Sequence, residues 1–408
     1  MFGMFGHVQR QENHEQDYLN CLESLLSKVP DKNAVLSKIK ERYPKVYPNI
    51  AQSLQFDSLK KEIAHPNDPS KTIAKLSGLS ESVFERERNT LYSIARLDDG
   101  TWAGCCADYA GSGVIYPHIS NENKYTYNRV KNWQDGFSCV SLGKYCAIFG
   151  LRGYEVYKRD VLIHSSNLAT RRVIFRSHAN TSRRVLFYRP LNYIYMINDQ
   201  DKLYRIDVSN EYKETLVLLN AEEFCFSEDK IYVLCSDGHV RSVSHTQTVD
   251  NSDGVLSSAE PIIDAETFYP GSIIKIDQGT LMVTGSNQKS SITDFFLVDA
   301  KTLEKKGSFV NWTPVRGVRI TPVLWLKKLP RTLLPENFPA NIELIIACNS
   351  TDIVSLLAVV DGTKIVPING VEVKDSERSG GINFLEILDN KILICTQSGD
   401  LMRVNIEF

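Results

Sequence analysis

The sequence lacks the features that mark membrane-spanning or secreted proteins. No segment approaches the roughly 18 consecutive apolar residues that a membrane helix requires. Residues 1–10 contain no apolar run behind a basic stretch of the kind that begins a secretory signal. The nine cysteines are an odd number, which argues against a framework of paired disulfides. We therefore expect an intracellular protein, in the cytoplasm or nucleus, with reduced cysteines that pack as small apolar residues.

The motifs of common catalytic and cofactor sites are also missing. There is no Gly-x-x-x-x-Gly-Lys-Ser/Thr loop for a phosphate and no pair of cysteines or histidines with zinc-like spacing. The eight histidines are scattered singly along the chain. Adjacent carboxylates at Asp98 and Asp99 precede Gly100, which is typical of a hairpin turn. The sequence therefore predicts no catalytic residue, no metal site and no cofactor.

The composition that is present is that of an ordinary globular protein. Hydrophobic residues make up 42% and charged residues 24% of the 408 residues, which is enough apolar material for a packed core. The formal net charge is only −2. A general attraction to nucleic acid or to an anionic membrane is therefore not expected, and any such site must be local.

A short apolar strand-like run recurs seven times along the chain. The runs start about 48 residues apart on average, close to the ~40–50 residues of one four-stranded propeller blade. They cover Thr101 to Cys106, Lys144 to Phe149, Asn192 to Ile197, Lys230 to Cys235, Thr280 to Gly285, Glu343 to Cys348 and Lys391 to Thr396. Each has a second strand-like run before it and a third after it, with turn residues such as Asp237-Gly238 between them. The pattern predicts antiparallel meanders in series.

The fourth strand of each predicted sheet is the weakest part of the pattern. For the second sheet two segments compete for this place, Val161 to Ser165 and Val173 to Arg176. The last sheet has no residues left for a fourth strand, and Thr72 to Leu76 is available to complete it. We therefore predict an all-β propeller of about seven four-stranded blades over residues 67–408, closed by that N-terminal strand. Six or eight blades remain alternatives.

The pattern resembles the WD40-like β-propeller superfamily over roughly residues 70 to 408. The resemblance concerns architecture, because the dipeptides that mark good WD repeats are missing. Gly238-His239 lies in the wrong part of its repeat, and no Trp-Asp dipeptide occurs. The resemblance implies a β-propeller and does not imply a particular activity.

Residues 1–66 are predicted to form an N-terminal tail and short α-helices. One helical face is spaced at intervals of three and four residues. It consists of Tyr18, Leu22, Leu25, Leu26 and Val29. Because so small a segment cannot form a large core by itself, this face is expected to dock on the chain's own propeller or on a partner.

An insertion loop is predicted at residues 327–340, between the first two strands of the sixth meander. It carries apolar residues outside the strand pattern, namely Leu329, Leu333, Leu334 and Phe338. Apolar loop residues of this kind are candidates for binding a partner. The alternative is that the loop folds over its own blade.

A local basic segment is the most pronounced charge feature. Between Arg152 and Ile206 there are eleven basic and four acidic residues. The candidate anion- or partner-binding residues within it are Arg171, Arg172, Arg176, Arg183, Arg184 and Arg189. If they gather on one face of the third blade, they could bind phosphate or an acidic peptide through charge-assisted hydrogen bonds. Otherwise they are a solvated surface.

These observations favour a non-catalytic protein–protein interaction scaffold, a subunit or adaptor of a larger intracellular complex. Two alternatives remain open. One is an adaptor that binds nucleic acid or anionic phospholipid through the basic segment. The other is an enzyme with a site in the central channel, which would need polar residues that converge there from several blades.

Overall fold

The computed structural model describes most of the chain from residue 63 onward. The gaps in this part are residues 66–67, 85–89, 101, 109–110, 116–135, 151–152, 159–160, 170–171, 175–179, 183–184, 251–253, 288–292, 310–322, 350–352, 374–381, 389–390 and 397–400. Of residues 1–62, only 34, 35, 37, 38 and 41 are described. By backbone contacts the chain divides into two units, Met1–Ile73 with Trp312–Arg316 and the remainder.

The first unit contains one small antiparallel sheet among its described residues. It pairs β1 (Ala64–His65) with β2 (Asp68–Thr72). The backbone N–H of Ile73 donates to the carbonyl of Ile63 at 2.7 Å, which extends the pairing by one hydrogen bond. Both of these isoleucine side chains are buried.

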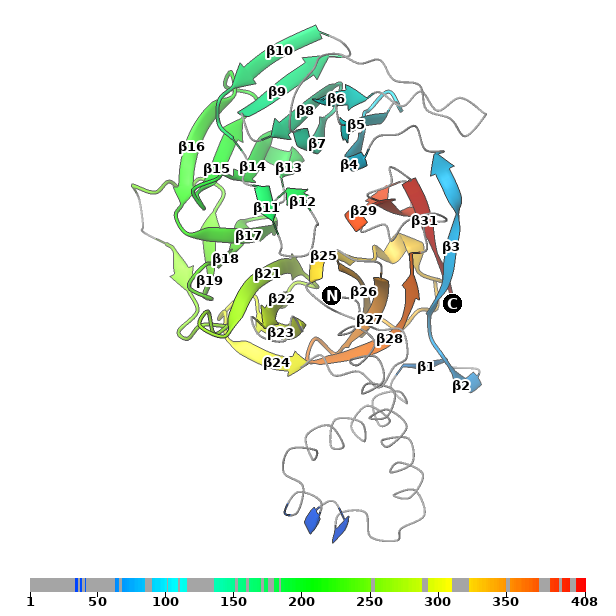
Figure 1. Cartoon of the computed structure of the whole chain (residues 1–408). Helices are drawn as coiled ribbons and strands as arrows, with labels where there is room; N and C mark the ends of the chain where they lie inside the picture. Colours follow the sequence, from blue (N-terminus) through cyan, green and yellow to red (C-terminus); the bar gives the residue numbers. More distant parts are fainter. Residues whose placement is uncertain are drawn as a thin grey trace, which may run out of the picture. The chain divides into compact units, whose positions relative to one another are not determined.

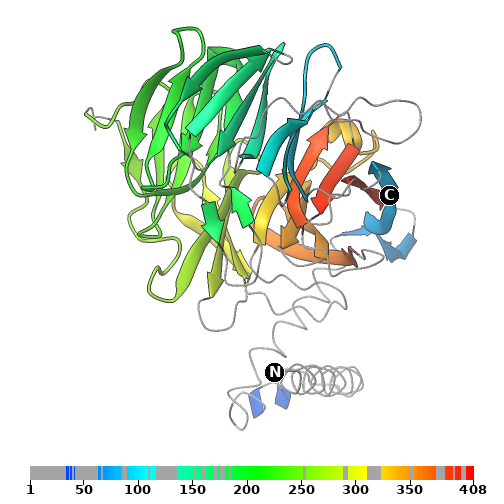
Figure 2. The same cartoon turned by 45° about the horizontal axis from the view of Figure 1, so that its top comes forward.

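The second unit is an all-β propeller built from antiparallel sheets that follow one another along the chain (Figures 1 and 2). Six of the described sheets have four strands each, and strands adjacent in sequence are hydrogen-bonded neighbours within them. The first two are β7 (Gly136–Leu142), β8 (Tyr145–Gly150), β9 (Gly153–Lys158) and β10 (Val161–Ser166), then β13 (Leu186–Tyr188), β14 (Tyr193–Ile197), β15 (Leu203–Asp207) and β16 (Lys213–Leu218). The next two are β17 (Ala221–Phe226), β18 (Lys230–Cys235), β19 (Val240–Ser244) and β20 (Leu256–Ser257), then β21 (Phe268–Lys275), β22 (Thr280–Asn287), β23 (Thr293–Asp299) and β24 (Lys305–Phe309). The last two are β25 (Val323–Lys328), β26 (Ile342–Asn349), β27 (Ile353–Val360) and β28 (Lys364–Glu372), then β29 (Ile382–Leu388), β30 (Lys391–Thr396), β31 (Leu401–Glu407) and β3 (Lys75–Phe84).

A further sheet has three described strands, β4 (Thr90–Arg96), β5 (Trp102–Asp108) and β6 (Gly111–Ile115). The first strand of each sheet lies innermost, and β4, β7 and β13 contact one another in succession. Strand β17 joins the series through a contact with β14, strands β21, β25 and β29 follow in succession, and β29 contacts β4. The ring of sheets is therefore closed.

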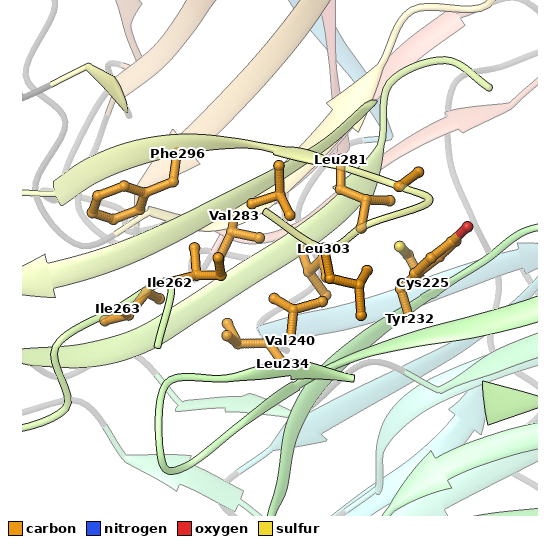
Figure 3. Packing of buried hydrophobic residues seen from close by; sticks show 13 residues of the cluster. Cys225, Tyr232, Leu234, Val240, Ile262, Ile263, Leu281, Val283, Phe296 and Leu303 are labelled. Carbon is orange, nitrogen blue, oxygen red and sulfur yellow. The ribbon is translucent and has the colours of Figure 1, made fainter. Parts of the chain in front are cut away.

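The predicted central runs each become the second strand of a sheet, because residues on both of their faces are buried between neighbouring sheets. Strand β18 is an example, with five consecutive buried residues from Ile231 to Cys235. The turn after it needs glycine at residue 238, where φ is +81° and a Cβ atom would lie 1.8 Å from the carbonyl oxygen of Ile263. Figure 3 shows the apolar cluster that fills the space between the β17–β20 and β21–β24 sheets, with Leu234 and Val240 facing Leu281 and Val283.

The closure of the ring by an N-terminal strand is confirmed. Strand β3 pairs antiparallel with β31 and completes the sheet that contains β29 and β30. The predicted segment, Thr72 to Leu76, overlaps β3 only at Lys75 and Leu76. On the other side of β3, the Asn369 side chain of β28 accepts from the N–H of Leu76 at 2.9 Å and donates to its carbonyl at 2.8 Å. A single amide side chain thus pairs with the backbone as a neighbouring strand would.

Three expectations need correction. Seven four-stranded blades are not supported, because six described sheets have four strands and the β4–β6 sheet has three; its predicted fourth strand, Tyr125 to Val130, lies outside the described residues. The N-terminal helices are not supported either, since the described elements include no α-helix and the face from Tyr18 to Val29 lies outside the described residues. The five described residues between 34 and 41 have helical backbone but are too few to define a helix.

The third correction concerns the insertion, whose first two residues belong to a strand. At the end of β25, Lys327 lies opposite Ile346 of β26 and Lys328 lies opposite Ile345. The loop therefore begins at Leu329. The Lys327 ammonium group pairs with the Glu386 carboxylate at 2.7 Å, which compensates for a charged residue at the end of a strand. Within the described part of the chain, no helix is long and apolar enough to cross a membrane.

Candidate functional site

The outer strand β10 exposes three consecutive large apolar side chains. Val161 is 62%, Leu162 41% and Ile163 46% exposed. Of the described strands only β9 pairs with β10, so no described strand lies on its outer edge (Figure 1). Natural proteins usually protect such an edge with lysine, proline, a charged side chain or a β-bulge. Residues 161–166 contain no lysine, proline or acidic or arginine side chain, and we take β10 as the candidate functional site.

A β-bulge at Ile163 marks this strand. Leu162 is opposite Tyr157 and His164 is opposite Val156, so Ile163 is the extra residue in the register. A bulge disrupts the ladder locally and increases the twist, and it occurs often at edges and beside functional sites. The bulge separates an exposed half of β10, residues 161–163, from a half that is tied to the next sheet.

The tied half of β10 contacts the hairpin between β15 and β16. The His164 ring stacks on the Tyr212 ring with 4.4 Å between centroids. The Ser166 hydroxyl donates to the Glu214 carboxylate at 2.5 Å. On the opposite side, the Tyr154 hydroxyl and His164 Nε2 are 3.3 Å apart. These contacts hold residues 164–166 against β9 and the β15–β16 hairpin, and Val161 and Leu162 continue the same strand in pairing with β9.

The hairpin that supplies Tyr212 has an unusual backbone. Glu211 has φ +50° and Tyr212 has φ +60°, the left-handed region that non-glycine residues rarely adopt. Each such residue costs roughly 1–2 kcal/mol. Strain of this kind persists only where the surrounding structure compensates for it, and it is concentrated at functional sites. Here the strained turn places the Tyr212 ring against His164.

The ionisation of the contacts around β10 is set mainly by burial. Burial lowers the pKa of His164 below its ordinary value, with the Glu214 carboxylate opposing this shift. Burial likewise raises the pKa of Tyr154 and Tyr212 above the usual tyrosine value. At neutral pH the stack is therefore uncharged. The His164–Tyr212 stack therefore supports the strand through packing, and the Ser166 hydroxyl adds a hydrogen bond to the Glu214 carboxylate.

Several other outer strands have a described segment of the chain beside them, although β20 also exposes a leucine, Leu256. On β31 the neighbour is β3. Beside β16, the N–H of Val249, a turn residue, donates to the carbonyl of Leu216 at 3.0 Å, which is one backbone hydrogen bond on that edge. Strand β24 contacts β28, and β28 contacts β3. Compared with these, β10 is a six-residue outer strand without a described strand on its outer side.

The structure describes two of the six predicted arginines. Arg171, Arg176, Arg183 and Arg184 lie outside the described residues. Arg172 begins β11 (Arg172–Ile174), which pairs with β12 (Asn180–Ser182) in a separate two-stranded sheet. Strand β12 contacts the inner strands β7 and β29 (Figure 1). The hairpin therefore lies at the inner side of the ring and not on an outer blade surface.

Arg189 is the one predicted arginine whose side chain is described. It lies in the 3₁₀ turn Arg189–Leu191 and is exposed. Its guanidinium is 3.6 Å from the Asp98 carboxylate, and both side chains are at least half exposed. Such a pair contributes little stability. Anion or lipid binding by the six arginines stays a prediction.

The insertion loop packs largely against its own sheet. Leu329 is fully buried, Leu334 is 9% exposed, and Leu333 and Phe338 are half-buried. Arg331 fixes the loop by donating to the carbonyls of Pro339, Ala340 and Ile342 at 2.8–2.9 Å. The accessible parts of the loop are the edges of Leu333 and Phe338. Partner binding there also stays a prediction.

The Phe338 ring meets the last residue of the chain. Its centroid lies 6.0 Å from that of Phe408, edge to face, and the Arg331 guanidinium lies 5.9 Å from the Phe338 centroid. Phe408 is 43% exposed. These contacts are sufficient to explain why Phe338 is held in place.

The buried thiols have an ordinary structural role. Cys139, Cys146, Cys235, Cys348 and Cys395 are free and buried. Burial raises the pKa of Cys235 to about 11 and raises that of Cys348 and Cys395 further. A thiol with so high a pKa is a poor nucleophile at neutral pH. Within the described ranges, no group of three His, Cys, Asp or Glu side chains could hold a metal ion.

The sequence pattern did not single out the apolar triplet of β10. Two segments competed for the fourth strand of this sheet, and the structure selects Val161–Ser166 and places residues 172–174 in β11. The signal available was the run Val-Leu-Ile itself. Three successive apolar residues do not alternate, so one face of an outer strand cannot bury them all.

Comparison with known proteins shows the fold. No protein-family model matches the chain, and no curated protein matches it. The solved structure of the N-terminal domain of Nup159 aligns with 82% of this chain and 95% of its own, at 12% identity and a TM-score of 0.54. A chain in the structure of S. cerevisiae Dbp5 bound to Nup159, Gle1, IP6 and ADP aligns over the same shares at 12% identity, with a TM-score of 0.52. At this identity the likeness shows a β-propeller and nothing finer.

Proposed function

We propose that this chain is a non-catalytic protein–protein interaction scaffold, a subunit or adaptor of a larger complex in the cytoplasm or nucleus. The observation that carries the proposal is the exposed apolar triplet of β10 on a strand that pairs with β9 and is anchored at residues 164 and 166 to the β15–β16 hairpin. Leaving such side chains in water forgoes roughly 25 cal/mol per Å² of burial, so exposed apolar surface on an ordered element is typical of binding sites.

Rigidity supports this proposal. A strand fixed before binding loses little conformational entropy when a partner docks. The stack of His164 on Tyr212 and the bond from Ser166 to Glu214 provide that fixation. In one similar solved structure, Dbp5 is bound to Nup159. That structure is an example of a complex between proteins that includes a chain similar to this one in fold. No partner is carried over from it to this chain.

The test compares two leucines that are matched in exposure and in position on an outer strand. Leu162 of β10 and Leu256 of β20 are each 41% exposed. Wild type, L162K and L256K would be immobilised, exposed to a lysate of the source cells, and the retained proteins quantified by mass spectrometry. We expect L162K to lose specific partners at least tenfold and L256K to retain them. Equal retention by all three proteins would contradict a binding role for β10.

A further inference from the structure

The edge of β10 has a chemistry that selects one kind of occupant. An edge strand presents outward N–H and C=O groups at alternate residues, and these bind most completely to another extended backbone. The chain itself uses this solution where β3 pairs along the edge of β31. An extended peptide is therefore the occupant that the rest of the fold suggests for β10.

Charge narrows the choice further. Val161 is opposite Lys158, which is exposed at the end of β9. At the far end of β10 the Glu214 carboxylate is already bonded to Ser166. Among the described residues paired with the triplet, the exposed charged side chain is that of Lys158, which favours an acidic residue on the occupant.

We propose that β10 binds an extended segment of a partner protein as a fifth, antiparallel strand of the β7–β10 sheet. The segment carries apolar side chains that cover Val161, Leu162 and Ile163, and it carries acidic residues at its C-terminal end, beside Lys158. This inference rests on the proposed function and names the binding mode and the chemistry of the partner. Backbone hydrogen bonds supply the affinity, and the side chains supply the selection.

The probe is a fluorescein-labelled eight-residue peptide in which valine alternates with threonine and which ends in two glutamates. Fluorescence anisotropy measures its binding to the full chain. One control peptide ends in two lysines. The second control is a pair of N-methylated peptides, one methylated on the odd-numbered amides and the other on the even-numbered amides. In one of the two, the methyl groups replace the N–H donors that would face β10. We expect the wild-type chain to bind the lysine peptide and one N-methylated version at least tenfold more weakly than the glutamate peptide. We expect L162K to bind the glutamate peptide at least tenfold more weakly than wild type, and L256K to bind it as wild type does.

Hydrogen exchange locates the peptide independently of the variants. Bound peptide is expected to slow exchange of the amides in residues 161–166 more than in β20. Absence of saturable binding, equal binding of both N-methylated versions, or protection outside β10 would each overturn strand addition. The proposed function is judged separately by partner retention. If L162K loses partners but the peptide does not bind wild type, the proposed scaffold function stands and only strand addition is refuted.

Discussion

Replacing Gly153 by alanine tests whether the end of β10 is held as tightly as its contacts imply. Gly153 begins β9 with φ +136°, and a Cβ atom there would lie 1.9 Å from the carbonyl oxygen of Ser166 on β10. The unfavourable backbone costs roughly 1–3 kcal/mol. Forcing an extra carbon into a packed site costs typically 1–3 kcal/mol more. The expected loss in free energy of unfolding is therefore about 2–6 kcal/mol, measured by urea unfolding.

Gly78 in β3 provides the matched control. Its φ is +128°, close to that of Gly153, but no heavy atom lies within 4 Å of its would-be Cβ. G78A should therefore lose only the backbone part, roughly 1–3 kcal/mol. In G153A the clash should also speed hydrogen exchange at residues 161–166, since Ser166 must move. Equal losses in the two variants, with unchanged exchange in β10, would refute the reasoning about this contact.

Three further outcomes are expected. L329A should lower the free energy of unfolding by about 2–5 kcal/mol and L333A by clearly less, because Leu329 is fully buried and Leu333 only half-buried; similar urea midpoints would show that the loop is not part of the core. Burial lowers the pKa of His245, so the unfolded chain binds more protons below about pH 6.5 and stability should fall as pH drops from there; urea unfolding at pH 7.5 and 5.5 should show a smaller loss in H245N. If the six arginines bind polyanions, the affinity for a labelled oligonucleotide should fall steeply between 50 and 200 mM salt, and a salt-independent affinity would exclude that role.

The core strands were predictable because their signal is local. A run such as Lys230 to Cys235 is apolar, β-branched or aromatic and is bounded by turn residues, and its observed bounds are the predicted ones. The same holds for Lys391 to Thr396. Such runs are buried between sheets whatever their exact neighbours are, so periodicity alone identifies them.

The outer strands were harder to predict for a physical reason. An outer strand is buried on fewer sides, so its sequence is less constrained by the core. Two segments of similar propensity competed in the second sheet, and only tertiary contacts distinguished them: β10 pairs with β9, whereas Arg172–Ile174 pairs with Asn180–Ser182. The same weakness explains the displaced bounds of β3.

The sequence by itself therefore determined the class of fold, the series of buried strands and the supply of a closing strand from the N-terminal side. Only the tertiary structure decided that the insertion loop buries Leu329, that the segment containing Arg172 pairs at the inner side of the ring, and that Val161 to Ile163 stay exposed. Burial in the core leaves a repeated pattern in the residues. Exposure at an edge depends on which distant segments come to cover it, and that information is not local in the chain.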